Sequence, residues 1–215
     1  MAERAGSGAI KFNVGNVLAD QHHYAERIAE WLDALPPTMR LLCECHHGIS
    51  IAEDPAVAAA IFDAAGPATR LQAIVHTHES DDHLRTRFDA YGDRISHVHV
   101  NFLNFTTMRA PRLIDIQDEV EAKVALLHGL GFQGSWTIEF TEGVLTANDN
   151  PDYLLARAAD DLAVLRGVLA KAATRSTPTL SSLTGLDSIP GPDDIAKLNE
   201  IGWRRPQPRA TRPMG

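Results

Sequence analysis

The chain has 215 residues, a formal net charge of −8 and a hydrophobic fraction of 44%, which suits a folded domain rather than a disordered chain. The acidic balance disfavours nucleic acid as the main partner, because binding to phosphates needs a basic surface. No run approaches the length of a membrane span, and the first residues lack the apolar core of a signal peptide. Cys43 and Cys45 are one residue apart on a predicted strand, a spacing unsuited to a disulfide. We therefore expect a cytoplasmic protein with reduced thiols.

Strand-like and helix-like segments alternate through most of the chain. The strand-like segments are short apolar runs at 10–15, at the start of 41–50, and at 71–78, 94–102 and 135–140. The helix-like segments have helical apolar spacing or end signals, and they cover 19–35, 54–66, 81–92, 115–131 and 151–173. In the second of these helices, Asp54 is the predicted cap and Pro55 takes the first position. The alternation predicts right-handed crossovers and a parallel sheet.

The composition changes near residue 173. Residues 173–215 are rich in Ser, Thr, Pro and Arg, with little periodicity beyond a short helical pattern at 192–200. We therefore predict a domain at 1–172 and a mostly flexible tail, which could dock through Trp203.

Each predicted strand has one apolar face and one face with polar groups, because side chains alternate across a strand. The polar groups are Lys11 and Asn13 on the first strand, Glu44 and His46 on the second, His76 and His78 on the third, His97, His99 and Asn101 on the fourth, and Glu139 on the fifth. An open doubly wound sheet favours strands that are apolar on both faces. A barrel instead gathers polar side chains at the carboxyl-terminal mouth. The pattern favours a barrel in which these groups face one another.

Several of these residues have structural interpretations. A lone buried histidine is more often a hydrogen-bonded core residue than a ligand, and we assign that role to His97. The two cysteines are expected to pack beneath a helix. Four other histidines on predicted helices are expected at the surface: His22, His23, His83 and His128. Glu44 and Glu139 differ, because converging carboxylates must be protonated, paired or metal-bound. Carboxylates and imidazoles from neighbouring strands suit a divalent ion such as Mn²⁺, Mg²⁺, Zn²⁺ or Co²⁺.

Four segments carry a resemblance to a known superfamily: LLCECHHGISIAEDP, RISHVHVNF, MRAPRL and GFQGSWTIEFTEG. Together they resemble the sugar phosphate isomerase/epimerase superfamily, the xylose-isomerase-like TIM barrels, over roughly residues 10–170. The resemblance implies a partial (β/α)8 barrel of about five parallel strands with covering helices, lacking the first three βα units. It implies that Glu44, His99 and Glu139 are metal ligands. Where many members read D-x-x-H this chain reads VHTHES, so either His76 replaces the Asp as ligand or the metal site is altered.

The function that the resemblance implies is isomerisation or epimerisation of a sugar, sugar phosphate or polyol. A divalent ion would stabilise an enediolate, and Glu44 and Glu139 would also transfer the proton. Three further residues are expected to bind substrate hydroxyls: His46, His78 and Asn101. Arg109 would hold a carboxylate or phosphate.

Two alternatives remain from the sequence. One is a degenerate, non-catalytic barrel that binds a sugar or a partner subunit. The other is a metal-dependent hydrolase like endonuclease IV, against which the acidic balance argues. Five strands cannot close a barrel, so we expect either a truncated barrel or one completed by a partner, including a second copy of the chain.

Overall fold

The computed structural model describes residues 7–15, 21–45 and 50–176. The chain divides into two units, Met1–Ala173 and Thr174–Gly215. The predicted tail, residues 173–215, lies outside the described residues from residue 177 onward, and so does Trp203. No helix in the described part of the chain is long and apolar enough to cross a membrane.

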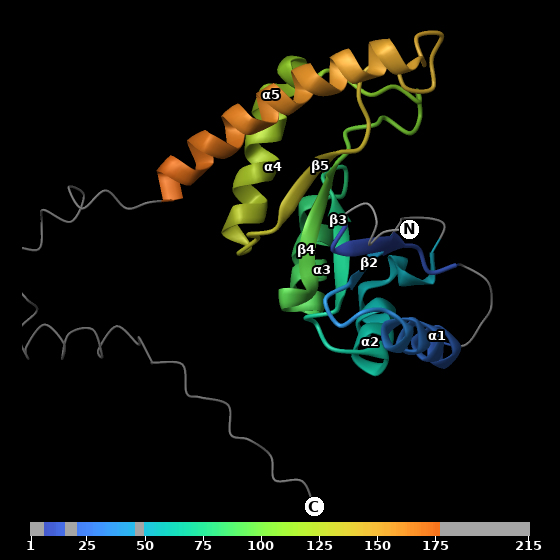
Figure 1. The fold of residues 1–215 in the computed structure, drawn as a ribbon. Coiled ribbons are helices and arrows are strands. Elements are labelled where there is room, and N and C mark those ends of the chain that lie inside the picture. The colour runs from blue at the N-terminus through green and yellow to red at the C-terminus, as the bar shows by residue number, and fades with distance from the viewer. Residues whose placement is uncertain (1–6, 16–20, 46–49, 177–215) are drawn as a thin grey trace, which may run out of the picture. The chain divides into compact units, whose positions relative to one another are not determined.

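Five parallel strands form one sheet in the order in which they occur in the chain. They are β1 (Ala9–Phe12), β2 (Arg40–Glu44), β3 (Leu71–His76), β4 (Ile95–Val100) and β5 (Ser135–Ile138). Figure 1 shows the sheet with its flanking helices, and together they make an α/β half-barrel. The predicted fold class is confirmed. The predicted ranges ran past the carboxyl ends of several strands: β1 ends at Phe12, β4 at Val100 and β5 at Ile138. β3 ends at His76, so His78 lies in the following turn.

The helices follow the strands as the sequence predicts. They are α1 (Gln21–Ala34), α2 (Pro55–Ala65), α3 (Asp81–Tyr91), α4 (Gln117–Gly129) and α5 (Pro151–Ser176). Asp54 accepts hydrogen bonds from two backbone N–H groups in the first turn of α2, and Ser80 does so once for α3. These caps fix the residue at which each helix begins after the preceding loop.

The core fills the space between the helices and the apolar face of the sheet. Cys43 of β2 and Cys45, which directly follows that strand, are both buried with free thiols, in the same cluster as Val75 of β3 and Val98 of β4. A second apolar cluster joins β4, α4 and α5 through residues that include Val100, Val124, Leu165 and Val168. With the apolar face covered in this way, the polar groups of the strands are left on the opposite face.

Gly134 lets the chain enter β5 directly against β4. A Cβ at this position would lie 2.1 Å from the carbonyl oxygen of Ser96, far inside contact distance. The pairing that follows sets Val98 opposite Trp136 and His99 opposite Thr137. This register pairs the last residues of the two strands, Val100 and Ile138, so Glu139 lies just beyond the carboxyl end of β4.

Candidate metal centre

Four side chains meet at the carboxyl end of the sheet, each from a different strand. Glu44 ends β2, His76 ends β3, His99 lies on β4, and Glu139 directly follows β5. One ligand atom from each lies within 4.8 Å of the other three. Glu44 and His76 are buried, with 2% and 1% exposure, while His99 and Glu139 are partly exposed. Parallel strands bring their carboxyl ends to one edge, which is why residues far apart in sequence converge here.

The contacts within this cluster are close but imperfect. His99 Nδ1 lies 3.0 Å from Glu44 Oε1 and 3.5 Å from Glu139 Oε1. His76 Nε2 lies 3.4 Å from Glu44 Oε1 and 3.8 Å from Glu139 Oε2. Among the described residues, none gives the buried His99 Nδ1 a hydrogen bond of good geometry. A buried nitrogen without such a partner is unfavourable unless another group binds it.

Lys11 of β1, to which the sequence analysis assigned no role, forms an ion pair with Glu44. Its Nζ lies 2.6 Å from Glu44 Oε2, while about half of the Lys11 side chain stays exposed. Burial acts to raise the pKa of Glu44, but His76, His99 and Lys11 outweigh it and hold that pKa well below its usual range. Glu44 is therefore ionised, with one oxygen facing Lys11 and the other facing the histidines.

His76 also carries charge at neutral pH. Burial acts to lower the pKa of His76, yet Glu44 and Glu79 raise it to about 9. The carboxylates of Glu139 and Glu44 likewise raise the pKa of His99 against the effect of burial. At neutral pH, protonated His76 and Lys11 thus offset the charge of the two carboxylates, which is one of the arrangements that converging carboxylates require.

A buried network behind His76 fixes its position. Glu79 accepts a hydrogen bond from the His76 backbone N–H at 3.0 Å, and its Oε1 lies 3.6 Å from His76 Nδ1. Arg87 donates through Nε to the other Glu79 oxygen. The guanidinium also donates to Tyr91 Oη and to the Cys45 carbonyl, each at 2.9 Å. Because Nδ1 faces Glu79, the Nε2 atom of His76 is the one turned toward Glu44 and Glu139.

Asn101, predicted to bind substrate, is fully buried and is hydrogen-bonded to Glu139. Its Nδ2 donates to Glu139 Oε2 at 2.8 Å, and its Oδ1 accepts from the Leu103 backbone at 2.9 Å. Thr77 completes the arrangement by accepting from the Asn101 backbone N–H at 2.9 Å. Its place in the structure therefore makes Asn101 a group that orients Glu139.

The other predicted substrate-binding residues are placed differently from one another. His46 lies outside the described residues. The His78 ring lies 5.1 Å from the rings of both His76 and Phe105, beside the cluster. Arg109 is exposed and lines a separate pocket that contains none of the four clustered side chains. The structure therefore does not bring Arg109 into the cluster.

His97 is hydrogen-bonded, as predicted, but it is only partly buried rather than a core residue. Its Nδ1 lies 2.7 Å from Ser135 Oγ, and its ring centroid lies 5.3 Å from that of His99. Burial, together with the charges of His99 and His76, lowers the pKa of His97 to about 4. His97 therefore remains neutral next to the charged cluster.

The four histidines expected at the surface differ in how exposed they are. His22 and His23 are exposed, and His128 is partly buried. The Nδ1 of His83 lies 3.9 Å from Glu79 Oε2, and its Nε2 is buried without a hydrogen-bond partner among the described residues. The surface assignment of His83 was therefore wrong, because α3 turns this residue toward the network behind His76.

The four clustered side chains fit a divalent ion. Ligands at 2.0–2.2 Å from one ion can be at most about 4.4 Å apart, so atoms within 4.8 Å of one another need only small movements. Two carboxylates and two imidazoles are ligand types that Zn²⁺, Mn²⁺ and Co²⁺ accept. His99 Nδ1, which faces both carboxylates, would be the ligand atom of that residue.

Comparisons with known proteins give limited further information. No model of a known protein family matches the chain, and no curated protein matches it. Among solved structures, a crystal structure of the IolI protein with a bound zinc atom aligns with a TM-score of 0.49 and 12% identity. The alignment covers 83% of this chain and 67% of that chain. This likeness does not assign the chain to a family.

Proposed function

We propose that this chain is a metal-dependent isomerase or epimerase of the xylose-isomerase-like superfamily, acting on a sugar, sugar phosphate or polyol. The observation that supports it is the convergence of two carboxylates and two imidazoles from four successive parallel strands. When bound, a divalent ion would supply the electrostatic stabilisation of enediolate oxygen that such proton transfers need.

The two carboxylates have different environments, and this suggests different roles. Glu44 is buried and held by Lys11, so it suits a fixed ligand. Glu139 is partly exposed and is oriented by Asn101. Burial acts to raise the pKa of Glu139, but His99 and the charge of His76 lower it below its usual value, so it is ionised and able to accept a proton. We assign to Glu139 the removal of a proton beside the substrate carbonyl and its return to the neighbouring carbon.

A direct test measures metal content and proton exchange separately. Wild-type protein should bind one Mn²⁺, Zn²⁺ or Co²⁺ per chain in titration calorimetry, and saturation at a hundred times Kd should add about 2.7 kcal/mol of stability. Glu44→Gln should abolish binding, whereas Glu119→Gln, an exposed change on α4, should not. The metal-loaded protein should exchange substrate C–H for deuterium in D2O when incubated with a panel of ketoses. If wild-type protein binds none of these ions, the proposal is wrong.

One observation favours a second candidate, a non-catalytic module that binds a sugar or a partner subunit. Lys11 and protonated His76 already offset the charge of the carboxylates without a metal. Lys11→Met distinguishes the two, because removing the ammonium should strengthen metal binding if Glu44 is a ligand. If Lys11→Met also binds no ion, the cluster is a structural ion-pair network and the binding module becomes the better proposal.

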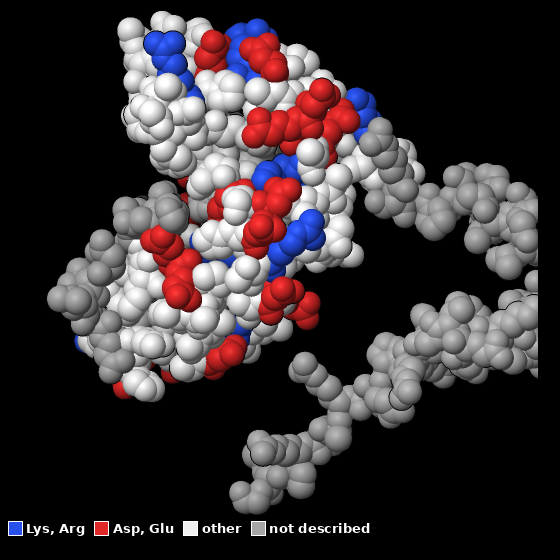
Figure 2. All heavy atoms as spheres, turned by 180° about the vertical axis from the view of Figure 1, so that it is seen from behind, with Lys and Arg blue, Asp and Glu red and all other residues white. Residues whose placement is uncertain are grey.

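The endonuclease alternative receives no support from the surface charge. Figure 2 shows Asp and Glu side chains distributed across the face that it displays, with Lys and Arg interspersed. The displayed face lacks the continuous basic surface that DNA binding requires, and the net charge of −8 agrees with this.

A further inference from the structure

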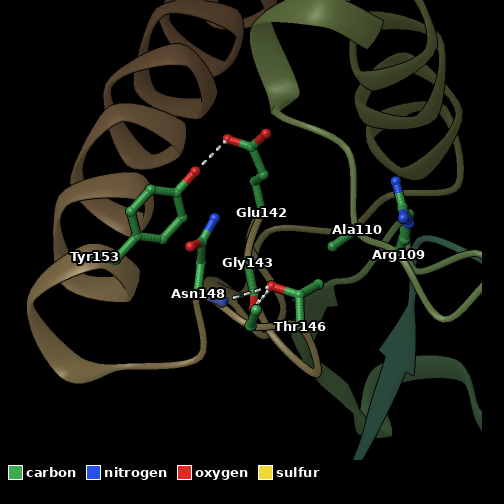
Figure 3. Close-up of a pocket in the computed structure, with 8 residues that line it drawn as sticks. Arg109, Ala110, Glu142, Gly143, Thr146, Asn148 and Tyr153 are labelled. Atoms are coloured by element: carbon green, nitrogen blue, oxygen red, sulfur yellow. Dashed lines mark hydrogen bonds between the residues drawn. The ribbon is translucent and has the colours of Figure 1, made fainter.

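A pocket lies at the same end of the sheet as the candidate metal centre. It has a volume of about 370 Å³ and is formed by the loop after β4 and the loop that connects β5 to α5. This volume is within the range of small-molecule sites. In Figure 3, Arg109 lies on one side of the pocket, with Asn148 and Tyr153 on the other and Glu142 between them.

The two walls of this pocket are tied together by one buried carboxylate. Asp161 of α5 is only 2% exposed. One of its oxygens accepts a hydrogen bond from the Leu113 backbone at 2.8 Å, and the other accepts from Thr141 Oγ1 at 2.6 Å. Leu113 follows the loop that carries Arg109, and Thr141 begins the opposite loop. The pocket therefore has a fixed width, which lowers the cost of ordering it around a ligand.

The wall opposite Arg109 is also rigid. Gly143 has φ +100°, and a Cβ there would lie 2.6 Å from Tyr153 Cε1, so glycine allows the Tyr153 ring to pack against the loop. Thr146 Oγ1 donates to the Gly143 carbonyl at 2.6 Å and accepts from the Asn148 backbone at 3.1 Å. These bonds fix the backbone that carries the Asn148 side chain.

The groups that remain available suit a particular kind of ligand. Among the described residues, none forms an ion pair or a side-chain hydrogen bond with the Arg109 guanidinium, and none bonds the Asn148 side-chain amide. Glu142 accepts a hydrogen bond from Tyr153 Oη at 3.1 Å and keeps further acceptor capacity. Arg157 stacks over the Tyr153 ring, 5.6 Å from its centroid, and adds a second cation nearby.

We propose that this pocket binds a small anionic polyol, a sugar phosphate or a sugar acid. Arg109 holds the anionic group through its paired N–H donors, while Asn148 and Glu142 bind hydroxyl groups. The site requires no metal ion, and it stands or falls independently of the metal centre.

Calorimetric titration in EDTA tests this with three probes: D-glucose 6-phosphate, D-gluconate and D-glucose. At least one anion should bind, and glucose should bind at least tenfold more weakly. Arg109→Gln, a change at an exposed residue, should weaken the anion at least tenfold. Asn148→Asp should also weaken it, because it places negative charge on the opposite wall. Arg166→Gln, on the exposed side of α5, should leave binding unchanged.

The outcomes separate the sources of the anion and the competing explanations. Binding of the phosphate alone would identify a phosphate site, and binding of gluconate alone a carboxylate site. Absence of binding by both anions, or equal binding of glucose, would overturn the proposal. So would binding that survives Arg109→Gln but is lost in Glu139→Gln, because that result places the ligand in the metal centre.

Discussion

Replacing Arg87 by Met should be the most destabilising single change in the network behind His76. Arg87 is 0% exposed, and its guanidinium bonds Glu79, Tyr91 and the Cys45 carbonyl. Met fills a similar volume but leaves the buried Glu79 carboxylate with His76, 3.6 Å away, in place of the closer guanidinium. Breaking a buried ion pair from one side typically costs 3–5 kcal/mol.

The pKa of Glu79 gives an independent magnitude. Burial acts to raise that pKa, but His76 and Arg87 outweigh it and lower it from 4.5 to about 2. This corresponds to about 3 kcal/mol of folded-state stability, to which His76 contributes first and Arg87 second, so it is an upper bound for Arg87. Because the folded pKa is lowered, the contribution is fully present above pH 4.5 and is lost as pH falls toward 2. We therefore expect Arg87→Met to lose up to about 3 kcal/mol at pH 7, and less below pH 4.

Urea denaturation of wild type, Arg87→Met and the double variant Arg87→Met/Glu79→Gln measures this directly. The double variant should recover part of the loss, because it removes the carboxylate that has lost the guanidinium. Arg85→Met, on the exposed side of the same helix, should change stability by less than about 0.5 kcal/mol. A loss below 1 kcal/mol for Arg87→Met, or no recovery in the double variant, would refute the reasoning. Arg87→Lys provides a milder variant if the Met protein does not fold.

Three further predictions follow from the structure. Metal affinity should rise between pH 6 and pH 8, by up to tenfold per pH unit for each proton that the ion displaces. The reason is that the pKa of His76 is raised to about 9, whereas a metal ion binds only the neutral imidazole. If calorimetry shows the same affinity at every pH, His76 is not a ligand. Gly134→Ala should cost about 1–3 kcal/mol in urea denaturation, because its Cβ would collide with the Ser96 carbonyl, whereas Gly129→Ala has open space and should cost nothing. The outer edges of β1 and β5 pair with no strand among the described residues, so we predict self-association in light scattering; a monomer at high concentration would contradict this.

The parts of the site that the sequence predicted are those that depend on strand periodicity. Glu44, His99 and Glu139 follow from side-chain alternation, because a strand's face is set by its backbone geometry alone. His76 followed in the same way, although the resemblance expects an Asp at its place. The strand ends were harder to predict, since the turn after His76 is decided by the Glu79 bond to its backbone.

The sequence analysis did not predict the network behind His76, because Arg87 and Tyr91 lie on a helix, α3, whose residues are mostly polar. Leu84, Arg87 and Tyr91 share one helical face, with spacings of three and four, and the structure buries all three. An arginine between two apolar residues on one face is the signal that could have revealed it. What periodicity could not supply is the partner, because Glu79 and the Cys45 carbonyl reach Arg87 through tertiary packing.

The order of the strands in the sheet has a consequence for how the protein opens. Each strand pairs with the strands next to it in the chain, so each pairing closes a segment of only about 30 residues. Stability in such an arrangement is close to a sum over neighbouring units, and opening should begin at the two ends. Amide hydrogens of β3, the central strand and the one farthest from both ends, should exchange most slowly with solvent, and those of β1 and β5 most rapidly. His76 would then stay anchored on the slowest-exchanging strand while Lys11 and Glu139 are released first.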